Sequence, residues 1–338
     1  MVDITSKIKK IIELINKGKY FTINRPRQYG KTTTLYMLSR TLKKREGYLV
    51  IRISFESIDI PTYKNQESFI QVFLDLLQHN IEIQGLDYLS EIICNESKNI
   101  NNMRELSKLI TKIVIAASKK VILIIDEVDK SSNNQLFLDF LGMLRSKYLM
   151  ANEGEEYTFH SVILAGVHDI KNLKLKIRNG EEKNYNSPWN IAEDFRVDLS
   201  FVVEDIATML KEYCFEYKVN MNIESIAEKL YFYTSGYPFL VSKLCKIIDE
   251  IIIEDEKKEW AVSYVDEAVK ILLKEDNTNF QSLIKNLENN KELYNFIKRI
   301  VIDGQNISYV ITDNIISQGT IYGIFKDEKG ICKIQNRI

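Results

Sequence analysis

The chain has 338 residues, of which 45% are hydrophobic and 28% are charged, and its 46 basic residues nearly balance its 47 acidic ones. This length predicts two or three domains, each able to bury a core of its own. A formal net charge of −1 excludes a global attraction to nucleic acid or to an anionic membrane, although a local basic patch is compatible with it.

We expect neither an export signal nor a membrane-spanning segment in this sequence. Lys7, Lys9 and Lys10 interrupt the amphipathic N-terminal segment, so a signal-peptide core is not expected. The chain lacks a run of about 18 apolar residues, which a membrane span needs. The four cysteines have no C-x-x-C spacing and are typical of reduced thiols. We therefore expect a cytoplasmic protein that does not enter a membrane.

Strand and helix patterns alternate in the N-terminal part of the chain. Apolar residues at helical spacing predict a helix at 5–17, and a β-rich run follows at 19–24. The later predicted helices are 32–45, 66–79, 103–118 and 133–149, and the later strands are 48–55, 121–125 and 160–166. The five consecutive aliphatics of 121–125 are typical of a central parallel strand buried on both faces. This alternation predicts an α/β fold in which helices flank a parallel sheet on both sides.

The remainder of the chain has a different pattern. A long polar loop is predicted at 168–190, followed by helices at 202–217, 223–234, 237–254 and 260–274. Two short helices and a hairpin-like tail then resemble a winged-helix module, with a turn near Asp327 to Gly330. We expect a nucleotide-binding domain at 1–200, a helical lid at 201–275 and the winged-helix-like module at 276–338. The chain ends directly after the second tail strand, and one interpretation is that a longer protein has been truncated there.

The strongest local motif is NRPRQYGKTTTL, which follows a predicted strand and opens a predicted helix. Backbone N–H groups at a helix N-terminus bind anionic phosphate, and Gly30 allows close approach of the backbone. Lys31 would face the β- and γ-phosphates, and the Thr32 hydroxyl would bind Mg²⁺. Arg25 departs from the pattern G-x-x-x-x-G-K-[ST], and G-K-T alone is also compatible with a plain helix start. Arg25 and Arg27 would either add charge near phosphate or pair with surface carboxylates.

A second motif follows the predicted central strand. Asp126 and Glu127 come directly after the aliphatic run, where ionised carboxylates need partners. Asp126 would hold Mg²⁺, and Glu127 would activate the attacking water as a general base. The alternative is that Asp126 caps a turn while Glu127 and Asp129 are solvated. Because both motifs follow predicted strands, the pair favours a nucleoside-triphosphate site.

These motifs belong to an ordered series: RPRQYGKTTTL, VILIIDEVDK, VILAGVHD, SPWNIAEDF and SGYPFLVSKLC. Over about residues 5–275 the series resembles the AAA-like ATPases of the STAND type, bacterial relatives of the AAA+ proteins. The resemblance implies a P-loop NTPase fold, ATP with Mg²⁺, Glu127 as the catalytic carboxylate, and Thr32 with Asp126 at the metal. The candidate nucleotide-binding residues are Arg25, Arg27, Gln28, Tyr29, Gly30, Lys31, Thr32, Thr33, Gly236 and Pro238.

The resemblance also implies a sensor after the VILAGV strand, where His168 and Asp169 lie. His168 has an alternative role as a loop residue bonded to backbone. Arg178 and Arg196 are candidates for an arginine finger, and surface positions are the alternative for both. Pro238 is equally suited to the first turn of a helix, which does not exclude a nucleotide contact.

The function expected from these residues is an ATP-driven molecular switch that hydrolyses ATP slowly with Mg²⁺. Its nucleotide state would control a protein partner or a homo-oligomer. One alternative is an initiator-like AAA+ ATPase whose winged helix binds DNA, but acidic residues offset Lys291, Lys298 and Arg299, so nucleic acid is not favoured. A second is a non-hydrolysing nucleotide-binding scaffold, suggested by Arg25 and opposed by Glu127. A kinase lacks support, because no substrate-pocket motif follows the loop.

Overall fold

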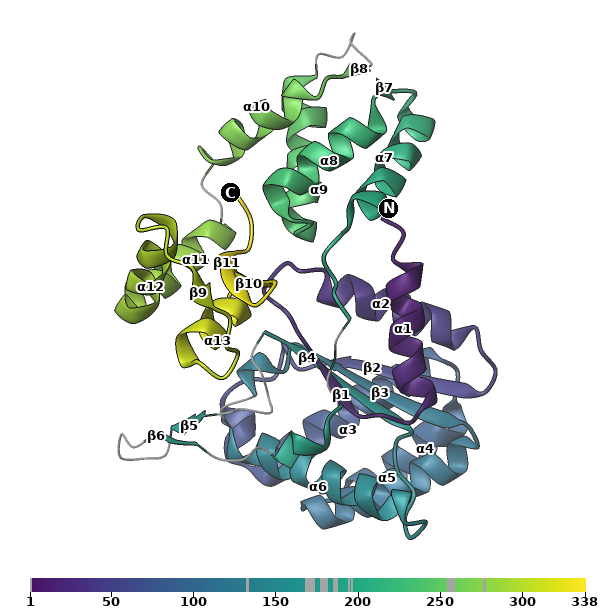
Figure 1. The fold of residues 1–338 in the computed structure, drawn as a ribbon. Coiled ribbons are helices and arrows are strands. Elements are labelled where there is room, and N and C mark those ends of the chain that lie inside the picture. Colours follow the sequence, from purple (N-terminus) through teal and green to yellow (C-terminus); the bar gives the residue numbers. More distant parts are fainter. Residues whose placement is uncertain are drawn as a thin grey trace. The chain divides into compact units, whose positions relative to one another are not determined.

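The structure is a computed structural model that describes residues 2–131, 134–167, 174–176, 182–184, 188–193, 195, 197–253, 259–275 and 278–338. Contacts divide the chain into two compact units. The sheet unit comprises Ile8–Asn24 and Lys31–Val197, and the helical unit comprises Met1–Lys7, Arg25–Gly30 and Asp198–Ile338. Each unit is described by itself (Figure 1).

The sheet unit is built on a parallel sheet with the described strand order β1-β4-β3-β2. Its strands are β1 (Phe21–Asn24), β2 (Tyr48–Ser54), β3 (Lys120–Asp126) and β4 (Ser161–Gly166). The chain crosses from β1 to β2 in one direction and returns through β3 to β4 in the other. Right-handed crossovers therefore put the helices of these connections on opposite faces of the sheet.

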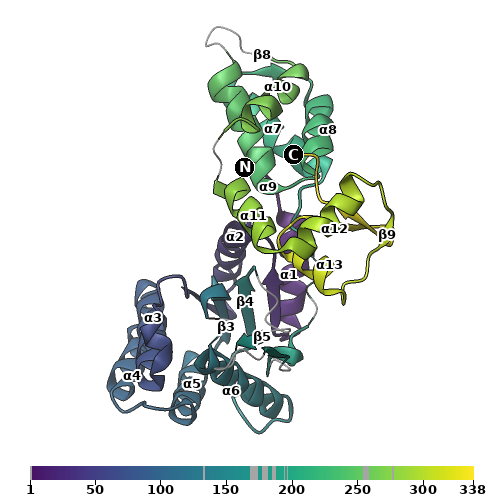
Figure 2. The same cartoon turned by 90° about the vertical axis from the view of Figure 1, so that its left-hand side faces the viewer.

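The helices of this unit follow that rule. They are α1 (Thr5–Asn16), α2 (Lys31–Lys43), α3 (Gln66–Ile83), α4 (Asp87–Ser97), α5 (Met103–Ala117) and α6 (Gln135–Asn152), with short 3-10 turns η1 (Pro61–Lys64) and η2 (Val128–Lys130). Figure 1 shows α1 and α2 on one face of the sheet and α3 to α6 on the other. Figure 2 shows α3, α4 and α5 grouped on the side away from α1. The predicted α/β architecture with helices on both faces is confirmed.

Asparagine side chains start many of the helices. Asn65, Asn102 and Asn134 each accept a backbone N–H in the first turn of α3, α5 and α6. Asn222 and Asn290 do the same in two helices of the helical unit. Such caps satisfy N–H groups that have no partner inside the helix. By contrast α4, which was not predicted, begins after Leu86 with no side-chain cap.

The core of the sheet unit lies between the sheet and α3 to α6. Alternate residues of a strand share one face, and Leu123, Ile125 and Leu164 belong to the same buried cluster as Phe69 and Phe140. Every residue of β3 after Lys120 is buried. The prediction of a central strand buried on both faces is therefore confirmed.

The predicted loop at 168–190 contains short regular elements. Among its described residues, β5 (Lys174–Lys176) and β6 (Glu182–Asn184) pair antiparallel, and the 3-10 turn η4 (Pro188–Ile191) follows. After the turn, the backbone N–H of Glu193 donates to Tyr20 O at 2.7 Å. The prediction of a continuous loop was therefore wrong. Short polar strands lack the apolar alternation by which strands are detected in a sequence.

The helical unit contains α7 (Val203–Tyr217), α8 (Ile223–Thr234), α9 (Pro238–Ile247), the π-helical turn η5 (Ile248–Ile252) and α10 (Ser263–Leu272). The expected helices are present, but the segment is not wholly helical. The two-residue strands β7 (Asn220–Met221) and β8 (Glu259–Trp260) pair in parallel. A pairing between such distant, very short segments leaves no periodicity in the sequence.

The C-terminal residues form α11 (Thr278–Asn289), α12 (Lys291–Val301), β9 (Ile307–Ser308), α13 (Asn314–Ile321), β10 (Phe325–Glu328) and β11 (Ile331–Ile334). The expected hairpin is confirmed, and Lys329 and Gly330 both have the positive φ angles of a tight hairpin turn. The expectation of two helices was wrong, because α13 follows them, and β9 adds a third described strand beside β11.

In the part of the chain that the structure describes, helices that combine the length and the apolar character of a membrane span are absent.

Close packing of α13 on the C-terminal hairpin yields a first prediction. A Cβ on Gly319 would lie 2.2 Å from the ring of Phe325, a side chain that is 1% exposed. Gly319→Ala should therefore destabilise this module by about 1–3 kcal/mol, more than the roughly 1 kcal/mol that alanine adds to a helix. Amide hydrogen exchange in α13 and β11 should be faster. Gly47→Ala, where a Cβ meets nothing within 4 Å, is the control. Unchanged protection in Gly319→Ala would contradict the packing argument.

Candidate functional site

Asp126 ends the buried strand β3 and is itself 2% exposed. Its Oδ1 accepts the backbone N–H of Glu127 at 3.1 Å, and its Oδ2 lies 3.4 Å from Nη2 of Arg52 on β2. A buried carboxylate needs such compensation, because burying an unpaired charge is costly. The sequence interpretation overlooked Arg52, although a charged residue inside the apolar run YLVIRISF is a signal that could have identified it.

Glu127 takes an unusual backbone conformation, with φ 56° and ψ 46°. This left-handed region is unfavourable for residues other than glycine and is often found at functional sites. The side chain is partly buried, and burial raises the pKa of its carboxyl group. The positive charge of Lys31 opposes this rise, whereas Asp126, Asp129 and Glu56 add to it. Glu127 therefore lies within the electrostatic reach of the lysine predicted to bind phosphate.

Lys31 is the first residue of α2 and is 5% exposed. Leu35, Leu38 and Leu42 of the same helix are fully buried and fix α2 on the sheet unit. Thr32, whose hydroxyl is expected to bind Mg²⁺, and Thr33 are exposed. A plain helix start with a solvated Lys31, the alternative from the sequence, does not agree with this burial.

Asp129 ties the turn after β3 to the end of β4. Both carboxylate oxygens accept the backbone N–H of Val167, at 2.7 and 2.8 Å. A Cβ on Gly166 would lie 2.8 Å from Asp129 Oδ1, so this glycine makes room for the bond. The alternative in which Asp129 is simply solvated is therefore wrong. The predicted sensor and finger residues His168, Asp169, Arg178 and Arg196 lie outside the described residues.

The loop segment Arg25–Gly30 belongs to the helical unit. Tyr29 is 6% exposed, and its hydroxyl lies 2.5 Å from Ser200 Oγ. The Tyr237 hydroxyl donates to the carbonyl oxygen of Arg27 at 2.5 Å. A Cβ on Gly30 would lie 4.0 Å from the ring of Pro238. Tyr237 therefore bonds the loop segment directly, and Pro238 lies close to Gly30.

The charges of the loop differ in their surroundings. Arg27 and Gln28 are exposed, whereas Arg25 is partly buried. Burial lowers the pKa of the Arg25 guanidinium, and the negative charge of Asp198 opposes that effect. Arg25 thus lies within the electrostatic reach of Asp198.

The backbone of Phe201 passes so close to position 236 that only glycine fits there. The φ angle of Gly236 is 73°, and a Cβ there would lie 1.8 Å from the carbonyl oxygen of Phe201. The backbone N–H of Phe201 donates to Gly236 O at 2.8 Å. Pro238 occupies the first turn of α9, where its missing N–H has no cost. Both residues have structural roles that are compatible with a nucleotide contact.

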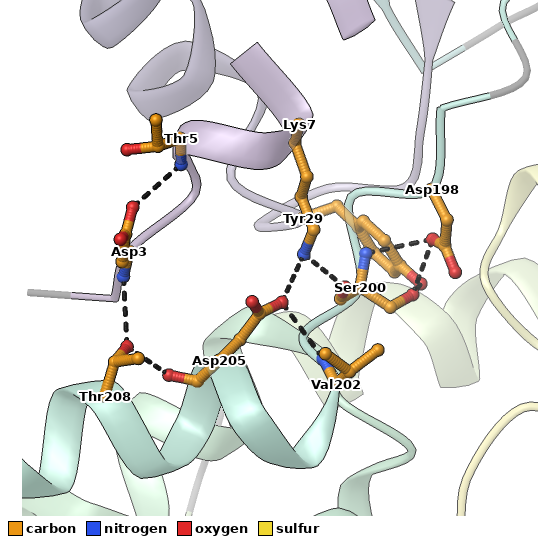
Figure 3. A network of polar contacts seen from close by, with 9 residues as sticks. All are labelled: Asp3, Thr5, Lys7, Tyr29, Asp198, Ser200, Val202, Asp205 and Thr208. Atoms are coloured by element: carbon orange, nitrogen blue, oxygen red, sulfur yellow. Dashed lines mark hydrogen bonds and ion pairs between the residues drawn. The ribbon is translucent and has the colours of Figure 1, made fainter. Parts of the chain in front are cut away.

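A polar network links the loop to the start of α7 (Figure 3). Lys7 Nζ donates to Ser200 O at 2.5 Å and to Asp205 Oδ2 at 2.7 Å. The backbone N–H and the hydroxyl of Ser200 donate to Asp198 Oδ1 at 2.9 and 2.8 Å. Since Tyr29 also bonds Ser200, one serine connects the N-terminal segment, the loop and the linker into α7. The sequence interpretation missed Lys7, Asp198, Ser200 and Asp205.

Known proteins resemble this chain in fold. A family model described as "AAA-like domain" matches residues 4–321. The Walker-type ATPase PABY2304 of Pyrococcus abyssi superposes with a TM-score of 0.61 at 16% identity, over 100% of this chain and 94% of that chain. The ORC2 protein of Aeropyrum pernix gives a TM-score of 0.47 at 10% identity, over 98% and 88% of the two chains. The RuvB branch migration motor of Thermotoga maritima gives 0.46 at 11% identity, over 98% and 92%. No curated protein matches the sequence.

The raised pKa of Glu127 yields a prediction about stability. Below the ordinary value of about 4.5 the carboxyl is protonated in both the folded and the unfolded chain, so it contributes nothing. As pH rises through the higher folded pKa, the buried group ionises at a cost, and the free energy of unfolding falls. Glu127→Gln should therefore raise the melting temperature at pH 8 and have a smaller effect near pH 4.

Scanning calorimetry at the two pH values measures this difference. The exposed Glu155→Gln is the control, because it removes a carboxylate of the same unit that is not buried. A shift of equal size at both pH values in Glu127→Gln would show that burial of its charge does not affect stability.

Proposed function

The chain belongs to the AAA-like domain family, and we propose that it is a Mg²⁺-dependent ATPase of the STAND type that acts as a nucleotide-controlled switch. The observation that carries the proposal is the end of β3. There a buried Asp126 is followed by Glu127 in a left-handed conformation, within the electrostatic reach of the buried Lys31. These three residues belong to one unit of the structure, so their arrangement does not depend on the other unit.

The donor types in the sheet unit fit Mg²⁺, which prefers oxygen ligands and is commonly held by one or two carboxylates together with phosphate oxygens. Asp126 and Thr32 are the residues that would hold it, and Thr32 is exposed. Bound there, the ion would neutralise charge on the β- and γ-phosphates. The pairing of Asp126 with Arg52 shows that this carboxylate already has a cationic partner.

Residues of this chain would bind the phosphates and accept the proton of the attacking water. Lys31 would bind the β- and γ-phosphate oxygens, and the N–H groups at the start of α2 would bind anionic oxygens. Glu127 would accept a proton from the water that attacks the γ-phosphorus, and ADP would leave with the broken bond's electrons. A raised pKa suits this role, because a general base is most effective when its pKa approaches the working pH.

The helical unit supplies the rest of the proposed nucleotide-binding set, namely Arg25, Arg27, Gln28, Tyr29, Gly30, Gly236 and Pro238. The closeness of Gly30 to Pro238 and the bond from Tyr237 to Arg27 support the grouping of the loop with this turn. His168, Arg178 and Arg196 stay predictions for a sensor and an arginine finger.

In the proposed switch, the helical unit would signal the nucleotide state to a partner. We retain the division into a nucleotide-binding domain, a lid and a winged-helix-like module at 1–200, 201–275 and 276–338. Within the helical unit, Arg337 N donates to Tyr233 O at 2.9 Å, and Lys326 Nζ donates to Ser235 Oγ at 3.0 Å. The C-terminal module thus contacts the end of α8 next to the Gly236–Pro238 turn. A protein partner or a second copy would respond to this module.

Lys31→Ala should weaken binding of Mg²⁺-ATP by about ten- to a hundredfold. The substitution removes a charged hydrogen bond to phosphate, worth about 1.5–3 kcal/mol. Isothermal titration calorimetry measures the change in Kd. Lys44→Ala, an exposed lysine just beyond α2, is the matched control and should bind as the wild type does. Equal affinity in Lys31→Ala and wild type would remove Lys31 from the site.

Glu127→Gln should bind ATP normally while phosphate release falls by about a hundredfold or more, the usual contribution of a general base. A phosphate-release assay with Glu155→Gln as control tests the assignment. Turnover equal to that of the wild type would show that Glu127 is not the base. Binding without turnover in the wild type would favour the non-hydrolysing scaffold, and no binding at all would contradict the proposed function.

A further inference from the structure

Tyr237 lies between the two candidate nucleotide-binding residues of its turn. Tyr237 is 6% exposed, and its hydroxyl donates to the carbonyl oxygen of Arg27, 210 positions away in the chain. Its ring meets the ring of Tyr29 edge to face, with centroids 4.8 Å apart and an interplanar angle of 84°. Tyr237 therefore contacts the loop both through a polar bond and through an aromatic pair.

The polar bond fixes the direction of one loop peptide. The Arg27–Gln28 peptide is trans, so its carbonyl and its N–H point in opposite directions. Holding the Arg27 carbonyl toward Tyr237 turns the Gln28 N–H away from Tyr237. Phosphate loops bind their ligand through N–H groups of this kind, so the direction of a single peptide affects binding.

The loop conformation also needs support. Gln28 has a φ angle of 56°, and Gly30 has one of 76°. The left-handed region is unfavourable for glutamine, and such a residue keeps it only when its surroundings hold it there. The Tyr237 hydroxyl donates to the Arg27 carbonyl, which directly precedes Gln28, and this hydrogen bond helps to stabilise the left-handed conformation of Gln28.

Tyr237 is itself held by its neighbours. Its backbone N–H donates to Thr234 O at 3.0 Å, and Pro238 restricts the backbone that follows. The bond between Phe201 N and Gly236 O fixes the preceding residue. The hydroxyl of Tyr237 thus projects from a turn that has little freedom, which is what a positioning group requires.

We propose that Tyr237 is a positioning residue for the phosphate loop: its hydroxyl holds the Arg27 carbonyl, and so presents the Gln28 N–H to a nucleotide phosphate. The inference rests on the proposed ATP-binding function and adds Tyr237, which is not among the candidate nucleotide-binding residues. The residue acts through the loop backbone and takes no part in the chemistry of hydrolysis.

Tyr237→Phe deletes the hydroxyl and keeps the ring that packs on Tyr29. Without the bond, the loop peptide is free to turn, and the Kd for Mg²⁺-ATP should rise by about two- to tenfold, the range of one hydrogen bond. KM should rise with it while kcat at saturating ATP is unchanged. In the protein without nucleotide, the Gln28 amide should exchange faster.

Tyr233→Phe is the matched control. It deletes a hydroxyl of the same unit that donates to Asp266 on α10 at 2.5 Å. This variant should keep the wild-type Kd, KM and loop exchange. Thermal unfolding of both variants shows whether each is folded.

Several outcomes would overturn the inference. One is a Tyr237→Phe protein with wild-type affinity and wild-type exchange at Gln28. Another is an equal loss of affinity in Tyr237→Phe and Tyr233→Phe, since that result would mean general destabilisation. A wild-type protein that does not bind ATP would contradict the proposed function instead. Amide exchange at Gln28 would still test whether the Tyr237 hydroxyl stabilises the loop. If Tyr237→Phe is poorly folded, faster exchange spread evenly over α9 and the loop would likewise reject a positioning role.

Discussion

The burial of a negative charge at the end of β3 is the constraint on which the candidate site depends. A strand surrounded by apolar side chains disfavours an ionised carboxylate, yet Asp126 is 2% exposed there. The Glu127 N–H and the Arg52 guanidinium compensate its charge from two directions. The parallel register that puts Ser54 beside Asp126 also brings Arg52 within reach. Sheet pairing therefore makes a buried carboxylate tolerable at the carboxyl edge of the sheet, which is where ligands of α/β sheets bind.

Backbone strain is found in each of the two units, at Glu127 and at Gln28. Glu127 and Gln28 each have a φ angle of 56°, which non-glycine residues rarely adopt. Glu127 follows β3 directly and precedes η2, whose Asp129 is bonded to Val167. Gln28 follows the carbonyl that Tyr237 holds. In each case a bond one or two residues away supports a conformation that is unfavourable in isolation, as is typical of functional loops.

The phosphate motif is divided between the two units at Gly30 and Lys31. Residues up to Gly30 contact the helical unit through Tyr29 and Tyr237, whereas Lys31 and the helix it begins belong to the sheet unit. Within the helical unit, the bonds of Ser200 to Tyr29, Lys7 and Asp198 join the loop to the beginning of α7 (Figure 3).

Local sequence patterns determined much of this protein. Five aliphatics predicted the central strand, helical spacing predicted most helices, and G-K-T and D-E after strands predicted the candidate catalytic residues. These features depend on neighbours along the chain, so periodicity and composition contain them. Tertiary structure alone decided the partners: Arg52 for Asp126, Val167 for Asp129 and Tyr237 for Arg27, across 74, 38 and 210 positions. One sequence without an alignment does not contain such pairings, because they arise only when strand register and turn geometry bring distant residues together.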